Sequence, residues 1–249
     1  MRMFPAQLQD LQAGWIDMFA LPAALRGVFG NQDQTVQQMI EECSSNLEED
    51  FHSMMEAAAS AMLHQLRQGE CSFFSDPRGF HTFLFYLSLQ YLRTRRIRDR
   101  FAQAMNGLEI PDHLADFSPQ RVAGILRVML ATSITSHFVG ARQHFRLALL
   151  RRTGADEFIT GDQPVVNTYA RSADLLSTPE KLEFYYPISP DTAVIVADER
   201  DRQLPEEVHL RHGETARYND MVARAAQSQV YASAEQILRE LSAAPRPSS

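Results

Sequence analysis

The hydrophobic period of this chain changes close to Thr153 and Gly154, and the change divides the sequence into two kinds of structure. Before it, apolar residues recur every three or four positions, as they do on one face of an α-helix. After it, short apolar runs are separated by turn residues, which is typical of β-strands. We therefore expect a helical part over about 1–152 and a sheet-containing part over about 153–242.

Three long helices are predicted in the first part. The first covers about 35–67 and the second about 77–106. The second begins at Ser75-Asp76-Pro77, where a capping side chain is followed by a proline suited to the first turn. The third begins at Ser118-Pro119 and runs on towards Leu150, and Gly140 is a point where it bends or divides.

Five short strands are predicted in the second part, at Phe158–Thr160, Val165–Thr168, Leu182–Tyr186, Thr192–Ala197 and Val208–Leu210. Helical patterning returns from about Thr215 to Tyr231, and Ser233 is expected to cap a last helix that ends near Leu241.

Five short strands are too few for an independent sandwich, so we expect the sheet to pack on the helices. The predicted fold is α+β and mainly helical: a helical N-terminal part packs on a small, mainly antiparallel sheet, and C-terminal helices close the domain. A single domain is expected over 1–242, followed by a disordered tail at 243–249.

Composition narrows the classes of function. A net charge of −7 and a pI of about 5.6 argue against a general affinity for nucleic acid, which requires a basic surface. Cys43 and Cys71 lack metal-ligand spacing, so we expect a reducing, cytoplasmic compartment. No apolar run reaches about 18 residues and the first residues lack a signal-peptide core, so neither a membrane span nor a signal peptide is predicted.

The segment from Glu157 to Asn167 contains the strongest candidate for chemistry. An apolar run stops at Thr160-Gly161-Asp162-Gln163-Pro164 and then resumes, which places the Asp162 carboxylate at the end of a strand. Gly161 and Pro164 constrain the backbone there. Asp162 is therefore predicted to be a general base or a metal ligand. The alternative is a turn carboxylate that accepts hydrogen bonds from its own backbone.

Three segments carry a family resemblance: 85–94, which ends in Gln90-Tyr91-Leu92-Arg93-Thr94, then Phe158–Val165, and then Tyr186-Pro187-Ile188-Ser189-Pro190-Asp191, followed by Tyr218-Asn219-Asp220. In this order they resemble the bacterial domain-of-unknown-function family 4238. Its members read Gln-x-x-Arg-Thr, a Phe-Ile-Thr/Ser-Asp-Asn-Pro strand and turn, Pro-Leu-Ser-Pro, and an Asn that opens a late helix. The resemblance covers about 35–232 and implies a map of site residues, with no settled activity.

The chain departs from the family pattern in two places. Members usually begin with a His-Tyr-Val-Pro motif, which is missing near Met1, so any role of that histidine is absent or displaced. Gln163 also stands where Asn is usual, which keeps the amide group but moves it by one methylene.

Two further positions in the matching segments have open interpretations. Gln90 and Arg93 lie one helical turn apart beside an apolar stripe, so they either tie the helix to the sheet, through an Arg93–Asp162 salt bridge, or recognise an anionic group. Asn219 lies on the apolar face of a late helix and is expected to be buried, bonded to the backbone of the 189–191 turn, with catalysis as the alternative.

The end of the second helix is strongly basic. It is interpreted as a solvated helix end, and contact with phosphate or nucleic acid through this run is the alternative; the residues are Arg93, Arg95, Arg96, Arg98 and Arg100. The histidines show no metal-ligand spacing, and neither a metal nor a particular cofactor is predicted. A homodimer through the Met-rich helix at 35–67 is a further alternative.

Two hypotheses of function follow. In the first, the protein is a hydrolase acting on a phosphate-containing substrate, a nucleotide or nucleic acid. Asp162 is then the acid or metal ligand, Asp191 or Glu49 joins it around a metal, and Arg93 is the anion clamp.

In the second, the protein is a non-catalytic binding or interaction module, with an unidentified ligand or protein partner. We favour it because the family's N-terminal histidine motif is missing. Gln90, Gln163 and Asn219 support the site in the first hypothesis. The full set expected to bind a ligand or to form a polar network is Gln90, Gln163, Ser189, Asp191 and Asn219.

Overall fold

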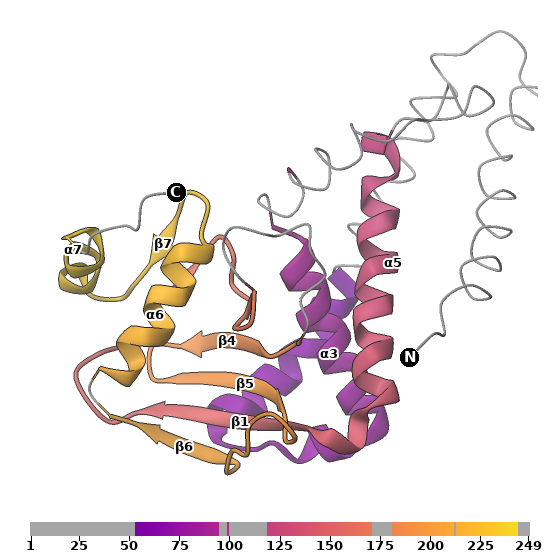
Figure 1. Ribbon diagram of the computed structural model, residues 1–249, viewed down its shortest axis with the longest axis horizontal. Coiled ribbons are helices and arrows are strands. Elements are labelled where there is room, and N and C mark those ends of the chain that lie inside the picture. Colours follow the sequence, from indigo (N-terminus) through magenta and orange to yellow (C-terminus); the bar gives the residue numbers. More distant parts are fainter. Residues whose placement is uncertain (1–52, 95–98, 100–118, 171–180, 212, 244–249) are drawn as a thin grey trace, which may run out of the picture. The chain divides into compact units, whose positions relative to one another are not determined.

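A computed structural model describes residues 53–94, 99, 119–170, 181–211 and 213–243, and these belong to one compact unit within 50–249 (Figure 1). A first helix covers 53–68. The later helices are α3 (Pro77–Leu92), α5 (Pro119–Gly140), α6 (Glu214–Ala225) and α7 (Glu235–Ala243). The strands are β1 (Phe145–Arg152), β2 (Thr160–Gly161), β3 (Val166–Asn167), β4 (Phe184–Ser189), β5 (Thr192–Asp198), β6 (Glu207–Leu210) and β7 (Val230–Tyr231).

The main sheet has five strands in the order β3-β4-β5-β1-β6. Strand β1 is antiparallel to β5, with Leu149 opposite Val194, and parallel to β6, with Leu150 opposite Val208. The pairs β3–β4 and β4–β5 are antiparallel, so the sheet is mixed. A separate two-stranded sheet joins β2 to β7. Helices and strands together make the fold α+β.

Helices cover both faces of the main sheet. Alternate residues of β1 point to opposite sides. Phe145, Leu147 and Leu149 pack with side chains of α3 and α5, whereas Ala148 and Leu150 pack with side chains of α6. Figure 1 shows α6 lying across the strands, away from α3 and α5. Because both faces are covered, β1 is continuously apolar over 147–150 and β5 over 193–197, rather than alternating.

The start of α3 confirms the predicted cap. The Asp76 carboxylate accepts a hydrogen bond from the Gly79 N–H at 2.8 Å, and Pro77 occupies the first turn. Gly79 is required by close packing, because a Cβ atom at this position would lie 2.2 Å from the Phe73 carbonyl oxygen. The expected continuation of this helix to about 106 falls largely outside the described residues.

The prediction that the third helix runs on towards Leu150 is wrong. Helix α5 ends at Gly140, and Phe145–Arg152 form strand β1. The segment Phe-Arg-Leu-Ala-Leu-Leu-Arg-Arg has no β-branched residue, so its local preference favours a helix. Pairing with β5 and β6, and burial on both faces, overrides that preference.

The predicted helix from Thr215 to Tyr231 is too long. Helix α6 ends at Ala225, and Val230–Tyr231 form β7 against β2. The last helix is present as α7. The predictions of a mainly helical chain, of a single domain over 1–242 and of a disordered tail depend on residues outside the described ranges.

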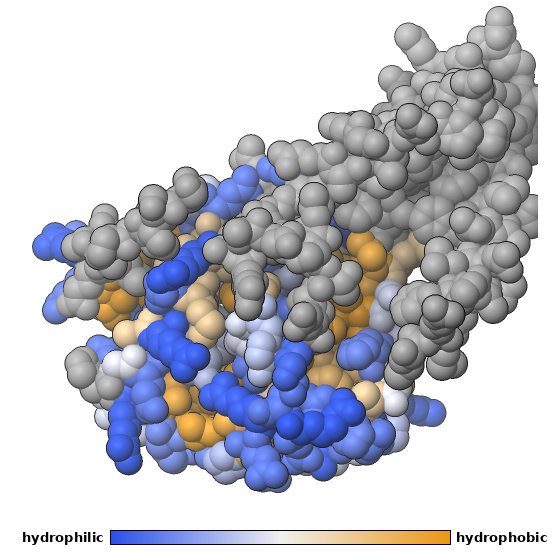
Figure 2. All heavy atoms as spheres, in the orientation of Figure 1, coloured by the Kyte–Doolittle hydropathy of each residue, from blue (hydrophilic) through white to orange (hydrophobic). Residues whose placement is uncertain are grey.

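The described surface carries few large apolar side chains. Met54, Leu130, Val139, Tyr169 and Tyr231 are exposed. In Figure 2, hydrophilic residues dominate the visible surface over the lower edge of the main sheet, and apolar residues show between them. Among the described helices, none combines the length and hydrophobicity needed to cross a membrane.

Candidate functional site

Asp162 follows β2 directly, and its carboxylate binds the loop that precedes β7. Oδ1 accepts a hydrogen bond from the Gln227 N–H at 2.8 Å. Oδ2 accepts from the Ser228 N–H at 2.8 Å, the Ser228 hydroxyl at 2.8 Å and the Gln229 N–H at 3.3 Å. Asp162 is therefore a turn carboxylate that holds backbone N–H groups. Those groups belong to the loop at 227–229, about 65 residues later in the chain.

These hydrogen bonds also set the charge state of Asp162. Burial by itself would raise the pKa of this carboxyl, but the donors at Ser228, Gln227 and Gln229 outweigh it, and its pKa lies below the ordinary value. Donors directed at a carboxylate favour its ionised form. Asp162 is consequently a charged acceptor at neutral pH, whereas a general acid would need a raised pKa.

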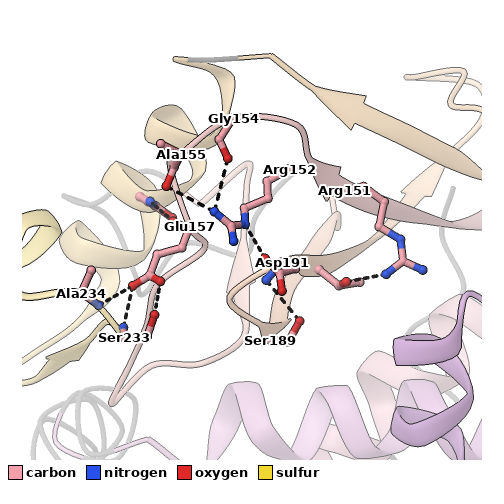
Figure 3. A network of polar contacts seen from close by, with 11 residues as sticks. Arg151, Arg152, Gly154, Ala155, Glu157, Ser189, Asp191, Ser233 and Ala234 are labelled. Atoms are coloured by element: carbon pink, nitrogen blue, oxygen red, sulfur yellow. Dashed lines mark hydrogen bonds and ion pairs between the residues drawn. The ribbon is translucent and has the colours of Figure 1, made fainter.

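A second carboxylate, that of Glu157, binds the chain that follows β7. It is buried, and it accepts hydrogen bonds from the Ser233 N–H at 2.5 Å, the Ala234 N–H at 2.9 Å and the Ser233 hydroxyl. Burial alone would raise the pKa of Glu157, but the bonds from Ser233 and Ala234 lower it below the ordinary value. Figure 3 shows this carboxylate facing Ser233 and Ala234, just before α7. Sequence reasoning missed Glu157, although its place before an apolar strand was a usable signal.

Gln163 ties the same turn to the end of α3. Its Oε1 accepts a hydrogen bond from the Thr94 hydroxyl, and its Nε2 donates to the carbonyl oxygens of Tyr91 at 3.1 Å and Val165 at 2.8 Å. The side chain is buried. The amide therefore bonds through both its oxygen and its nitrogen, and it joins two of the segments that carry the family resemblance.

Asn219 is buried on α6, as expected, but its backbone partner differs from the prediction. Its Oδ1 accepts a hydrogen bond from the Ile159 N–H at 3.1 Å, and its Nδ2 donates to the Glu157 carbonyl at 2.8 Å. The side-chain amide of Asn219 thus bonds to a backbone N–H and a backbone carbonyl just before β2, as the backbone of a neighbouring strand would. The predicted partner, the 189–191 turn, instead accepts a hydrogen bond from the Phe158 N–H at the Pro190 carbonyl.

Arg93 does not form the predicted salt bridge with Asp162. It lies at the C-terminal end of α3 and pairs with Glu56 on the first helix, and both side chains are about half exposed. Asp162 binds the loop at 227–229 instead. Gln90 is half-buried one turn earlier. The structure thus gives Arg93 and Asp162 separate partners, and it joins only Gln163 and Asp162 in one turn.

Asp191 and Ser189 belong to the turn between β4 and β5. The Ser189 hydroxyl accepts a hydrogen bond from the Asp191 N–H at 3.3 Å, and the Asp191 carboxylate pairs with Arg152 at the end of β1. Arg152 also donates to the carbonyl oxygens of Gly154 at 3.2 Å and Ala155 at 3.3 Å. In Figure 3 Arg152 is directed to Asp191 and to those carbonyl groups.

A polar chain on the α6 face of the sheet was missed. Glu183 is buried and accepts hydrogen bonds from the Thr168 hydroxyl at 2.6 Å and from Arg202 at 3.4 Å. Arg202 also donates to the Tyr218 hydroxyl at 3.1 Å. A carboxylate inside the apolar run 182–188 was the available signal, because a buried charge needs a partner.

Tyr185 lies beside this chain. Its ring stacks on that of Tyr218 with centroids 4.7 Å apart, and its buried hydroxyl has no hydrogen-bond partner among the described residues. Burial of the hydroxyl is the main reason that the pKa of Tyr185 lies well above its ordinary value, and the electrostatic effect of the nearby Tyr218 adds to it.

The remaining candidates concern metal binding and the basic end of the second helix. Within the described ranges, no group of three or more His, Cys, Asp or Glu side chains is arranged to hold a metal ion. Glu49 and the basic residues Arg95, Arg96, Arg98 and Arg100 lie outside the described residues.

Comparison with known proteins agrees with the resemblance seen in the motifs. The family model described as "Protein of unknown function (DUF4238)" matches residues 29–236. No curated protein and no solved structure matches the chain. The matched range contains β2 and its turn, the end of α3, the β4–β5 turn and Asn219. The chain therefore belongs to the DUF4238 family of proteins of unknown function.

Proposed function

We propose that this protein is a non-catalytic binding or interaction module whose polar residues fasten its secondary-structure elements to one another. The observation that carries the proposal is the environment of Asp162. Both carboxylate oxygens already accept hydrogen bonds from within the chain, four in total. A carboxylate used in this way stabilises a loop, and binding a metal or removing a proton would compete with those bonds.

The other residues of the network support the same function. Gln163 bonds to α3, and Asn219 bonds to the backbone on either side of Phe158. Asp191 pairs with Arg152. Each of these side chains links segments far apart in the sequence. Gln163 and Asn219 are buried and resemble the satisfied polar interior of a folded domain, whereas Asp191 lies at the surface.

The alternative function, a hydrolase acting on a phosphate-containing substrate, is less well supported. It requires Asp162 and Arg93 to act on one substrate. Asp162 is bound to the loop before β7, whereas Arg93 pairs with Glu56. Asp191, the acid that was expected to join Asp162 around a metal, pairs with Arg152.

Thermal unfolding of Asp162→Ala and Asn219→Ala tests the two functions against each other. We expect both substitutions to lower the melting temperature by several degrees, roughly, because each leaves backbone groups without their partners. Mg²⁺, Mn²⁺ and a panel of nucleotides should leave the melting temperature of the wild-type protein unchanged. Arg93→Ala is the matched control, since an exposed ion pair contributes little.

A different result would favour the hydrolase. If Asp162→Ala melts like the wild type but loses a rise in melting temperature that a metal or nucleotide produces in the wild type, Asp162 is a ligand-binding residue. The same samples can be assayed for release of inorganic phosphate from the nucleotides.

A further inference from the structure

We propose that the loop at 227–229 is an oxyanion-binding site whose bound anion is the Asp162 carboxylate of the same chain. The site takes a small anion with two oxygens on one centre, such as a carboxylate or a phosphate. This proposal goes beyond the interaction function above, because it assigns a ligand class to a specific set of donors.

The geometry of the loop supports the proposal. The N–H groups of Gln227, Ser228 and Gln229 follow one another in the chain and converge on the two oxygens of a single carboxylate. The Ser228 hydroxyl adds a fourth donor. Successive backbone N–H groups directed at one point form a recurrent binding site for phosphate and carboxylate in proteins.

The donors of this site carry no charge, and a second carboxylate, Asp99, lies at its edge and accepts a hydrogen bond from the Gln227 side chain at 3.2 Å. All four donors are neutral amide or hydroxyl groups. The net lowering of the Asp162 pKa agrees with a loop that prefers the ionised form of its ligand. A free anion in place of the carboxylate would meet the same donors.

The site is open to solvent from the side of the loop. Gln227, Ser228 and Gln229 are all exposed, and Asp162 is half-buried. Removing the carboxylate of Asp162 therefore leaves the four donors within reach of small ions in solution.

The loop should keep its position without the Asp162 carboxylate, because three other contacts hold it. Strand β7 pairs with β2, the Asp162 N–H donates to the Gln229 carbonyl at 3.0 Å, and Glu157 binds Ser233 and Ala234 on the far side of β7. Val230, Ala232 and Ile237 of the same segment also pack against the core cluster beneath α6, so apolar contacts anchor it independently of Asp162.

The test is thermal unfolding of full-length Asp162→Ala in acetate, phosphate or chloride at equal ionic strength. We expect acetate and phosphate to raise its melting temperature in a saturable way, by a few degrees at concentrations roughly 100 times the dissociation constant. Chloride should give no such rise, and neither should any of the three anions with the wild type. The larger rise of acetate or phosphate identifies the preferred anion.

Matched variants show where the anion binds. Asp162→Ala combined with Ser228→Ala should respond more weakly, because one donor is lost. Asp162→Asn should not respond, because its amide fills the site. An equal response of Asp162→Ala to all three anions, or an equal rise in the wild type, would overturn the proposal.

A second measurement applies even if Asp162→Ala does not fold. Ser228→Ala in the otherwise unchanged protein should raise the pKa of Asp162, as followed by carboxyl NMR titration, since it removes one donor from the anion. A pKa that does not move would also overturn the proposal. Neither result depends on whether the protein is a non-catalytic module, so the two proposals fail separately.

Discussion

The two sheets of this protein are held in opposite ways. In the main sheet, β1 and β5 pair over seven residues and are buried on both faces by helices. In the small sheet, β2 and β7 pair over only two residues. Of the two residues of β7, Val230 is half-buried and Tyr231 is exposed. The Asp162 carboxylate binds the loop before β7, and the Glu157 carboxylate binds the chain after β7, so charged hydrogen bonds reinforce this short pairing on both sides.

The two sheets therefore use different sources of stability. Apolar burial contributes roughly 25 cal/mol per Å² and needs no particular direction, so it suits long strands between helices. A two-residue strand buries little apolar surface. Hydrogen bonds to a charged carboxylate can instead fasten it at two positions, one before and one after the strand. We therefore expect damage to the main sheet to destabilise the protein much more than damage to the small sheet does.

The largest effect should come from Leu149→Ala in β1. Leu149 is 1% exposed and packs under the helices on one face of the main sheet. Its truncation should lower the free energy of unfolding by about 2–5 kcal/mol, measured by chemical denaturation. Val139→Ala on α5, where the side chain is 42% exposed, is the control and should cost less than about 0.5 kcal/mol. Similar losses in the two variants would contradict burial as the source of stability.

A smaller effect is expected from Asn219→Ala, which removes the link between α6 and the chain entering β2. It leaves the Ile159 N–H and the Glu157 carbonyl without their partner, at a cost of about 1–3 kcal/mol. Asn219→Asp keeps the acceptor but places a second carboxylate oxygen against that carbonyl, so it should be at least as destabilising. If Asn219→Asp is as stable as the wild type, the bond to Glu157 contributes nothing.

The two carboxylates should make the small sheet sensitive to acid. Their folded pKa values lie below the ordinary values of 3.8 for Asp162 and 4.5 for Glu157, so the unfolded segment binds protons first as the pH falls. Their contribution is complete above those ordinary values and is lost as the pH falls through the folded values. Hydrogen exchange should show local opening at 227–234 in this range before the amides of β5 open. Simultaneous opening of both regions would contradict separate stabilisation.

The smallest effect is expected from Arg239→Ala on α7. Arg239 pairs with Glu235 one helical turn away, and both side chains are more than three-quarters exposed. Such pairs contribute less than about 0.5 kcal/mol, so the melting temperature should not change measurably. A clear loss would mean that α7 supports the fold more than its exposure indicates.

Much of the architecture was predictable where local signals and burial agree. The Asp76 cap and the start of α5 at Pro119 follow from local backbone chemistry. Strand β5 also begins at the predicted residue, and β4 overlaps the predicted strand at 182–186 but begins at Phe184 and ends at Ser189; both segments are rich in strand-forming residues. Strand β1 was not predictable in this way, since its residues prefer a helix until β5 and β6 provide partners.

In the candidate site, too, local features could be predicted from the sequence and distant contacts could not. The segments with the family motifs were found in advance, because Asp162, Gln163 and Asn219 occupy recognisable turns and helix faces. Their partners were not found: Asp162 binds a loop about 65 residues later, and Arg93 pairs with Glu56 on another helix. Contacts between residues so far apart in the chain leave no pattern in the local sequence.

The family, the α+β class and the positions of Asp162, Gln163 and Asn219 as site residues could all be predicted from the sequence. The roles of these residues depend on the folded structure, because a carboxylate is a catalyst, a metal ligand or a structural acceptor according to the groups around it. For Asp162 those groups are three backbone N–H groups and a hydroxyl, brought to it by the pairing of β7 with β2. Hydrogen bonds act over a few ångströms, so the assignment depends on which distant segments the fold brings into contact.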